Sequence, residues 1–285
     1  AVKALLKEAD NRLGFSISRM MFDGPDEKLM KTEFTQPAIL TASVAVSTIL
    51  REHGLTPDVV AGHSLGEYSA LVTAGALSFS DAIHVVHLRG KYMQEAVPLG
   101  EGGMAAIIAL DAESIKDICN TISTEEKPVQ AVNFNCPGQV VIAGATEAVK
   151  QACNAMKEAG AKMAVMLKVS APFHSIMMEP AAVKLKEVLD TVTIQDAQMP
   201  VYANYNAAAE IKADDIRKNL VLQAAHPVLW DASIQQMIAD GADLMIEAGP
   251  GTVLSGFMKR INRRIRTLHA EDVETVTNVL NTWEE

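Results

Sequence analysis

Residues 58–75, with the sequence DVVAGHSLGEYSALVTAG, determine how this chain folds. The first five predict a short buried strand, and the last eleven predict a helix closed by a glycine. A GxSxG pentapeptide at 62–66 stands between them, where a nucleophile elbow lifts a serine hydroxyl out of a sheet. We therefore interpret Ser64 as a nucleophile and expect the N–H of Leu65 to face a developing oxyanion. The alternative is a serine that caps an ordinary turn.

Outside this stretch, helical and extended patterns alternate, which favours an α/β fold with a mostly parallel sheet. Further helices are predicted at 36–53, 80–97, 111–121, 145–159, 175–190, 214–225, 231–240, 252–262 and 271–282. Further strands are predicted at 104–110, 129–134, 139–143, 162–167, 200–203, 243–247 and 265–269. Thr35 and Ser80 are the expected caps of the first two of these helices, with Pro37 in the first turn.

The middle of the chain follows the order β-α-β-β-α-β, which is typical of a ferredoxin-like unit. We interpret residues 99–168 as a small domain of this kind. It is inserted into a larger α/β domain formed by residues 1–98 and 169–285.

Composition excludes several classes of protein. The chain has 285 residues, of which 49% are hydrophobic, enough to bury a core. Its longest apolar run, 104–110, is far shorter than the roughly 20 residues of a membrane span, so we expect no membrane partner. A formal charge of −10 argues against nucleic acid as a partner. Three cysteines without a CxxC pair indicate a reducing compartment.

A serine hydroxyl is a poor nucleophile at neutral pH and needs a base. Among seven histidines, His174 is the candidate, because it follows Pro172 on a loop that leads from the insert back to the larger domain. The alternative is that His174 is not a base but a capping or buried histidine with a structural role. His63 adjoins the nucleophile but points elsewhere on a tight turn. His84 and His87 form an i, i+3 pair with no evident third ligand, so no metal site is expected.

Arg89 lies in a mostly apolar predicted helix, where a guanidinium must find an anion. One interpretation is a salt bridge to a protein carboxylate such as Asp81 or Glu95. The other is a bidentate grip on the carboxylate of a substrate.

Several ordered motifs together resemble the malonyl-CoA:acyl carrier protein transacylase family, from residue 1 to about 270. They are TQPA at 35–38, GHSLGEYSA at 62–70, LRGxxM at 88–93, GQVV at 138–141, APFH at 171–174, Gln223 with Pro227 and Trp230, and EAGPG at 247–251. Most are weak singly, but their joint order is specific.

The resemblance implies transfer of a malonyl group from malonyl-CoA to the phosphopantetheine thiol of acyl carrier protein. It also implies an O-malonyl-serine intermediate, fatty-acid or polyketide synthesis in the cytoplasm, no cofactor, and an α/β-hydrolase-like larger domain. Ser64 would be the nucleophile and His174 the base, oriented by the main-chain carbonyl of Gln223. Arg89 would pair with the malonyl carboxylate. Three further residues are expected to contact substrate: Met93, Phe173 and Asn135.

One feature of the family has no counterpart in the printed sequence. The family begins with a strand and a GQGSQ loop, whose glutamine supplies a second oxyanion donor beside the N–H of Leu65. We expect this segment to precede Ala1 in a longer chain. A molecule that truly lacked it is expected to have weak activity and poor stability.

Five cations lie close together in this acidic chain: Lys259, Arg260, Arg263, Arg264 and Arg266. We call them the basic patch. One interpretation is a solvated face; the other is a docking surface for the acidic carrier protein.

Two other functions compete with acyl transfer. A serine hydrolase or thioesterase could use the same elbow, but it calls for a late histidine, and His269 is the only late candidate. A non-catalytic scaffold is the third possibility, if the amino-terminal segment is truly absent.

Overall fold

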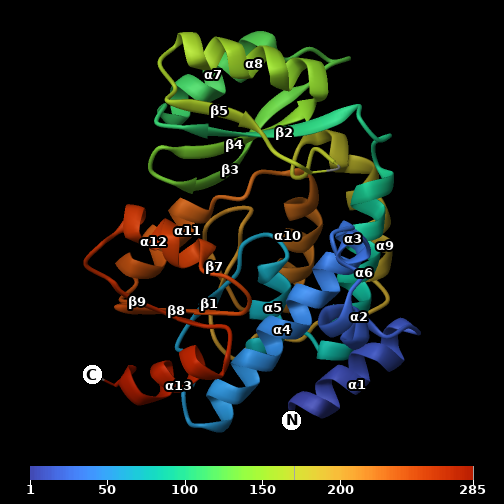
Figure 1. Ribbon diagram of the computed structural model, residues 1–285, viewed down its shortest axis with the longest axis vertical. Coiled ribbons are helices and arrows are strands. Elements are labelled where there is room, and N and C mark those ends of the chain that lie inside the picture. The colour runs from blue at the N-terminus through green and yellow to red at the C-terminus, as the bar shows by residue number, and fades with distance from the viewer. Residues whose placement is uncertain (170, 285) are drawn as a thin grey trace.

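The computed structural model describes residues 1–169 and 171–284. Ser170 and Glu285, both inside the predicted larger domain, lie outside the described residues. Figure 1 shows two parts: a smaller one formed by the middle of the chain and a larger one that carries both chain ends. The prediction of a mixed α/β fold is confirmed.

The smaller part is a four-stranded sheet with two helices on one face. Its elements are β2 (Gly102–Ile108), α7 (Ala112–Ile122), β3 (Val129–Cys136), β4 (Gln139–Ala145), α8 (Thr146–Glu158) and β5 (Met163–Met166). The strand order is β3-β4-β2-β5, and every neighbouring pair is antiparallel. Apolar residues of α7 and α8 pack on the sheet around Ile107 and Ile142, both fully buried. This packing gives the smaller part a core of its own.

Helices dominate the larger part. Those before the smaller part are α1 (Val2–Leu13), α2 (Ile17–Asp23), α3 (Asp26–Leu29), α4 (Thr32–Glu52), α5 (Gly66–Thr73) and α6 (Phe79–Glu95). Those after it are η1 (Ile176–Met178), α9 (Glu179–Leu189), α10 (Ala213–Ala225), α11 (Trp230–Ala239), α12 (Val253–Ile261) and α13 (Val273–Thr282). The main core lies among α4, α5, α6, α9 and α10.

The sheet of the larger part is divided. The described strands form a three-stranded sheet, ordered β1-β6-β7, and a separate pair, β8-β9. They are β1 (Val60–Ala61), β6 (Val201–Tyr202), β7 (Ala209–Glu210), β8 (Leu244–Ala248) and β9 (Arg266–Ala270). Both β1–β6 and β8–β9 are parallel, as expected, whereas β6–β7 is antiparallel. The expected single, mostly parallel sheet is therefore replaced by two small ones, and β7 was not predicted.

The expected caps of α4 and α6 were wrong. The helix α4 begins earlier than predicted, with Lys31 at its N-cap, so Thr35 and Pro37 lie inside the helix. Proline has no N–H to donate to the carbonyl of Glu33, and Nδ1 of His87 donates to that carbonyl instead, over 2.9 Å. Because His87 of α6 supplies the missing hydrogen bond, Pro37 is tolerated inside α4.

At α6, the cap is Ser78 rather than Ser80, and its side chain accepts a hydrogen bond from the N–H of Asp81. The helix predicted at 175–190 begins with the 3-10 turn η1 before α9. Short shifts of this kind arise because several neighbouring polar residues can serve as the N-cap, so the first residue of a helix is poorly determined by the sequence.

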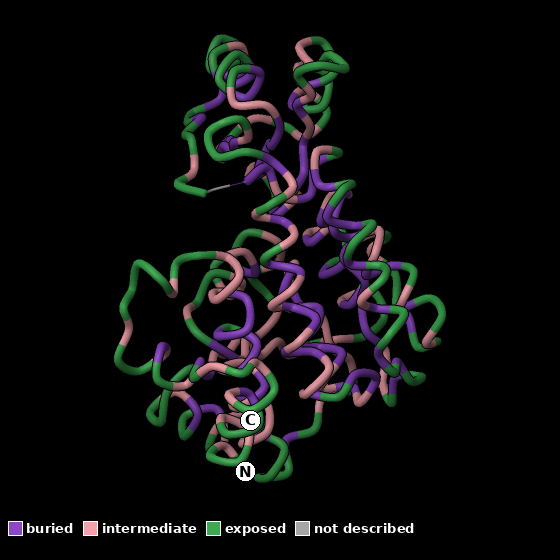
Figure 2. Tube along the Cα trace, turned by 90° about the vertical axis from the view of Figure 1, so that its right-hand side faces the viewer, coloured by how far each residue is buried: buried purple, intermediate pink, exposed green. Residues whose placement is uncertain are grey.

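Buried segments run through the middle of both parts (Figure 2). Within the described residues, no helix has both the length and the apolar character needed to cross a bilayer.

Candidate active site

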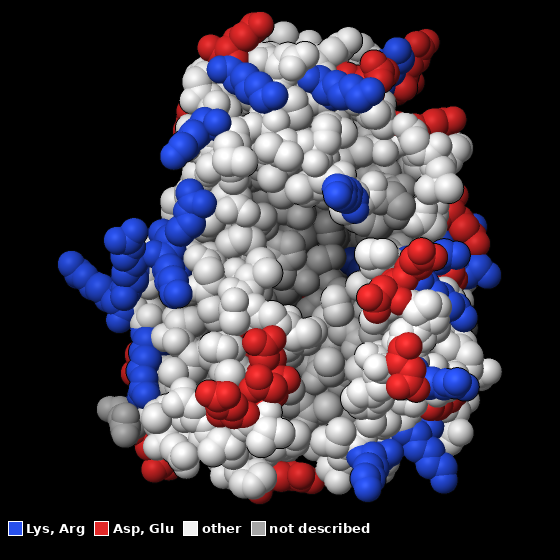
Figure 3. Space-filling model, viewed as in Figure 1, with Lys and Arg blue, Asp and Glu red and all other residues white. Residues whose placement is uncertain are grey.

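A pocket of about 270 Å³ opens where the smaller part meets the larger one. Figure 3 shows that this face of the molecule is hollowed between the two parts. Residues of α4, α6, β2, β3 and the segment after β5 line it together with the elbow between β1 and α5. The lining residues used below are Gln36, Ser64, Leu65, Arg89, Met93, Asn133, Phe173 and His174.

The elbow is a sharp turn with Ser64 at its corner, in the left-handed region at φ 52°. A Cβ on Gly62 would lie 1.9 Å from the backbone of Gly66, so only glycine fits at position 62. The side chain of Asn204 holds the turn: its Oδ1 accepts from the N–H of Ser64 over 2.6 Å, and its Nδ2 donates to the Gly62 carbonyl over 2.7 Å. Within the described residues, the N–H of Leu65 has no hydrogen-bond partner, so it is free to face an incoming oxygen.

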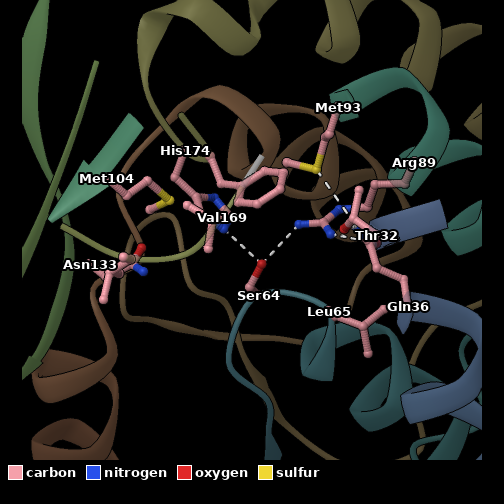
Figure 4. A pocket seen from close by; sticks show the side chains of 12 residues that line it. Thr32, Gln36, Ser64, Leu65, Arg89, Met93, Met104, Asn133, Val169 and His174 are labelled. Carbon is pink, nitrogen blue, oxygen red and sulfur yellow. Dashed lines mark hydrogen bonds between the residues drawn. The ribbon is translucent and has the colours of Figure 1, made fainter. Parts of the chain in front are cut away.

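His174 lies against this corner, as Figure 4 shows. Its Nε2 is 2.7 Å from Oγ of Ser64, and its Nδ1 is 2.8 Å from the main-chain carbonyl of Gln223. Because a carbonyl can only accept, Nδ1 carries the proton and Nε2 can accept the proton of Ser64. Burial, and then the nearby charge of Arg89, lower the pKa of His174 to about 3. The imidazole is therefore neutral and ready to act as a base at physiological pH.

Arg89 is buried, and its guanidinium is held by neutral groups. Nη1 donates to Oε1 of Gln36 over 2.7 Å, and Nη2 donates to Oε1 of Gln223 over 2.9 Å. Nη2 also donates to Oγ of Ser64 over 3.0 Å. No carboxylate among the described residues forms an ion pair with it. An uncompensated buried cation of this kind favours an incoming anion.

The protein carboxylates considered for Arg89 pair elsewhere. Asp81 lies 3.8 Å from Arg12, and Glu95 lies within 4.0 Å of Lys91 and Lys184. Among the residues that the structure describes, Arg89 therefore forms no internal salt bridge, which was the alternative interpretation.

Two of the expected substrate contacts, Met93 and Phe173, line the pocket, but Asn135 does not. Its Oδ1 accepts from Nε2 of His63 over 2.8 Å. Asn133 lines the pocket instead, and its buried Oδ1 has no described partner. The register between β3 and β4 shifts on both sides of this segment, which disrupts the alternation that would place both asparagines on one face.

His63 and His87 have structural contacts away from the nucleophile. The ring of His63 packs against Trp230 and Phe257, with centroids 5.6 and 6.5 Å away, and so turns away from the pocket as expected. The ring of His87 packs against Phe15 and donates to the backbone of α4. No three His, Cys, Asp or Glu side chains in the described part of the chain gather as metal ligands.

Three polar residues of the site were not assigned from the sequence. Gln36 stands in the TQPA motif, and a motif of known order could have pointed to it. Glu67 follows the nucleophile within GHSLGEYSA, where the helical pattern alone does not point to a role in the site. No sequence pattern points to Asn204 as a residue of the site, because it follows a two-residue strand far along the chain from the elbow.

The arrangement combines a nucleophile, a base and a fixed cation around one oxygen. Such a set can form and break an ester at Ser64, and the cation can select for an acyl group that carries a negative charge.

The model of a known family matches nearly the whole chain: the acyl transferase domain, over residues 1–283. The malonyl CoA-acyl carrier protein transacylase of Bacillus subtilis (strain 168) is 49% identical over 285 residues, covering 100% of this chain and 90% of that protein. Its counterpart in Escherichia coli (strain K12) is 49% identical over 261 residues, covering 91% of this chain and 84% of that protein.

Solved structures are similar as well. The transacylase of Coxiella burnetii has a TM-score of 0.95 and 40% identity, with 98% of this chain and 89% of that chain covered. A malonyl-transacylase in complex with a type II polyketide synthase acyl carrier protein has a TM-score of 0.95 and 45% identity. The match covers 98% of this chain and 91% of that chain. By its sequence and its structure, this chain belongs to the acyl transferase domain family and, within it, to the malonyl CoA-acyl carrier protein transacylases.

Proposed function

We propose that this protein transfers the malonyl group of malonyl-CoA to the phosphopantetheine thiol of acyl carrier protein, in fatty-acid or polyketide synthesis. One observation carries the proposal: Oγ of Ser64 lies between Nε2 of His174, at 2.7 Å, and Nη2 of the buried guanidinium of Arg89, at 3.0 Å. The names of the relatives support it, as does the relative that was solved with a carrier protein.

The first half of the reaction loads the enzyme. Oγ of Ser64 attacks the thioester carbonyl of malonyl-CoA while Nε2 of His174 takes the hydroxyl proton. The N–H of Leu65 stabilises the tetrahedral oxyanion. The carbon–sulfur bond then breaks, His174 returns the proton to the CoA sulfur, and an O-malonyl ester remains on Ser64.

The second half repeats these steps with another thiol. The phosphopantetheine thiol gives its proton to His174 and attacks the ester carbonyl. The bond from carbon to Oγ breaks, and His174 returns the proton to Ser64. The groups named supply a nucleophile, a base and an oxyanion donor, so we propose that the transfer uses no cofactor.

Arg89 would select the substrate. The malonyl carboxylate can take the place of Oγ of Ser64 as a partner of the guanidinium and form an ion pair with it, while Gln36 and Gln223 continue to hold the guanidinium. An acetyl group would leave the guanidinium in its present contacts and gain no such pair. Met93 and Phe173 would line the space around the three-carbon acyl group.

A hydrolase is disfavoured by the partner of the base. In a Ser-His-Asp hydrolase, Nδ1 of the histidine meets a carboxylate, whereas here it meets the carbonyl of Gln223. His269, the late candidate, lies on β9, whereas the imidazole beside Ser64 belongs to His174.

Intact-mass measurement after incubation with malonyl-CoA tests the proposal. We expect a malonyl adduct on wild type, none on Ser64→Ala, and discharge by carrier protein. Discharge by water alone would indicate a hydrolase, and the absence of any adduct would indicate a scaffold. Either result would overturn the proposal.

We also propose the basic patch as the docking surface of the carrier protein. Figure 3 shows Lys and Arg side chains along the edge where α12 and β9 lie. None of the five cations forms an ion pair with a carboxylate of the described residues. The same helix, α12, carries Phe257, which packs against His63 beside the nucleophile. A partner held there would therefore be close to the pocket.

For the fold, we propose an α/β-hydrolase-like domain, residues 1–98 and 169–285, with a ferredoxin-like insert at 99–168. The strand order β3-β4-β2-β5 supports the insert, and the elbow after a parallel strand supports the larger domain. We propose a cytoplasmic location because none of the three cysteines is paired.

A further inference from the structure

A fully buried carboxylate lies behind the nucleophile, and the reaction above does not use it. Glu67 is in the first turn of α5, three residues after Ser64, and its side chain is 0% exposed. One oxygen, Oε2, accepts from the backbone N–H of Asn204 over 3.0 Å and from Nε2 of Gln223 over 2.9 Å. The other oxygen, Oε1, is buried without a hydrogen-bond partner in the described structure. Burying a carboxyl group with one oxygen unpaired loses the free energy of its hydration, so this position needs a structural or functional explanation.

Both partners of Glu67 position the reacting groups. Asn204 fixes the elbow by bonding the N–H of Ser64 and the carbonyl of Gly62. Gln223 orients His174 through its main-chain carbonyl and holds Arg89 through its side-chain oxygen. Glu67 is therefore connected to the nucleophile, the base and the cation in each case through one intervening residue, either Asn204 or Gln223.

The side-chain amide of Gln223 has a direction, and its neighbours set it. Its Nε2 donates to two acceptors, the carboxylate of Glu67 and the carbonyl of Ser64, at 2.9 Å each. Its Oε1 consequently faces Nη2 of Arg89. With the amide reversed, an NH₂ group would face the guanidinium, and both would be donors. Only the observed direction lets Gln223 hold the cation.

We propose that Glu67 is a positioning residue for malonyl transfer: it fixes the direction of the Gln223 amide, and through it the place of Arg89 and His174. This inference rests on the function proposed above and goes further, because it assigns malonyl selectivity to a residue that does not contact substrate. Nothing in this role requires a charge on Glu67, since an acceptor oxygen at Oε2 is sufficient.

Burial raises the pKa of Glu67 to about 7, so its carboxyl is partly protonated near neutral pH. The hydrogen bonds from Asn204 and Gln223, and then the charge of Arg89 on α6, oppose this shift. Glu210 on β7 and Tyr68 on α5 also face it. A glutamine at position 67 would keep an acceptor at Oε2 and place its NH₂ at Oε1. The neutral variant therefore preserves the contacts that matter.

Four variants separate positioning from stability. Glu67→Gln keeps the acceptor, Glu67→Ala removes it, and Glu67→Asp keeps a carboxylate but withdraws it by one methylene. Glu210→Ala is the matched control, because Glu210 is another buried acid that accepts a hydrogen bond from Asn219 of α10 and, among the described residues, forms no hydrogen bond with a residue of the site. Each is assayed for kcat/KM of enzyme acylation with malonyl-CoA and acetyl-CoA, below its own Tm.

We expect Glu67→Gln to stay within about threefold of wild type, and Glu67→Ala and Glu67→Asp to lose about 10- to 100-fold with malonyl-CoA. In these two variants the malonyl-to-acetyl ratio should fall, because Arg89 loses its anchor. Glu210→Ala should lower Tm and leave the ratio unchanged.

The proposal is overturned if Glu67→Asp keeps the wild-type malonyl-to-acetyl ratio or if Glu67→Gln is as impaired as Glu67→Ala. It is also overturned if Glu210→Ala lowers this ratio as much as Glu67→Ala does. Should Glu67→Ala not fold, Glu67→Asp decides the matter. A wild-type protein that forms no malonyl adduct would instead refute the function itself, so the two failures are distinguishable.

Discussion

Nη2 of Arg89 donates a 3.0 Å hydrogen bond to the same Ser64 Oγ that lies 2.7 Å from Nε2 of His174. The nucleophile is thus bonded to the cation proposed to select the substrate. A hydrogen bond from a guanidinium withdraws electron density from the oxygen and makes it a weaker nucleophile. A malonyl carboxylate that binds Arg89 would draw this donor away and leave Oγ to His174. Selectivity should then be visible in the rate of acylation as well as in binding.

Replacing Arg89 with alanine should lower the malonyl-to-acetyl ratio of kcat/KM by about 10- to 100-fold, the usual value of a hydrogen-bonded charge contact. Acylation measured by rapid quench and intact mass gives the ratio. Lys91→Ala is the control, because Lys91 lies on the same helix but is half exposed and pairs with Glu95. An unchanged ratio in Arg89→Ala would contradict the role given to the guanidinium.

Supplying the carboxylate separately tests whether it activates Ser64. We expect formate, bound at Arg89, to increase the rate of acetylation of Ser64 by acetyl-CoA, because it compensates the guanidinium beside Oγ. The rate is measured across a formate titration at constant ionic strength. Equal stimulation of Arg89→Ala would show that the effect is a salt effect, and no stimulation of wild type would show that Arg89 does not restrain Oγ.

The reaction should tolerate acid unusually well. Burial and the charge of Arg89 lower the pKa of His174 to about 3, so the imidazole stays neutral as pH falls from 7 to 5. A histidine with an ordinary pKa near 6.5 would become protonated over that range and cease to be a base. We expect kcat/KM for malonyl-CoA, which reports the free enzyme, to change little between pH 5 and 7. A tenfold fall per pH unit below 6.5 would contradict the assignment.

Stability should decline as pH rises, in part through Glu210. Burial raises the pKa of this carboxyl to about 8, so between its unfolded value near 4.5 and pH 8 the folded state binds a proton that the unfolded chain has lost. The free energy of unfolding therefore falls with increasing pH across that range. Glu210→Gln should show a weaker decline, measured as Tm from pH 5 to 8. Parallel curves for the two proteins would contradict this prediction.

Reversing charge in the basic patch should affect only the second half of the reaction. We expect Arg263→Glu with Arg264→Glu to raise KM for carrier protein about tenfold at low salt and less at high salt, because the attraction is screened. Formation of the malonyl enzyme should be unchanged. Lys116→Glu with Lys150→Glu, on α7 and α8, is the matched control. No effect at low salt would exclude docking at this patch.

The sequence by itself determined the local features of the protein. The elbow around Ser64 could be predicted because Gly62 and the strand-to-helix order are encoded within a few residues. The β-α-β-β-α-β order of the middle part could be predicted for the same reason, since its apolar periodicity and turn residues are local. Residue types in ordered motifs, such as Arg89 and His174, indicated the family.

Only the tertiary structure decided how these residues meet. Hydrogen bonds from Ser64 to Asn204, and from Gln223 to Glu67, join positions more than a hundred residues apart. Asn133 rather than Asn135 reached the pocket because irregular pairing with β4 re-aimed the strand. Contacts of this kind depend on packing between elements and leave no periodic pattern in the chain. The sequence therefore indicated which chemical groups were present, and the fold determined which of them share a proton, a charge or a hydrogen bond.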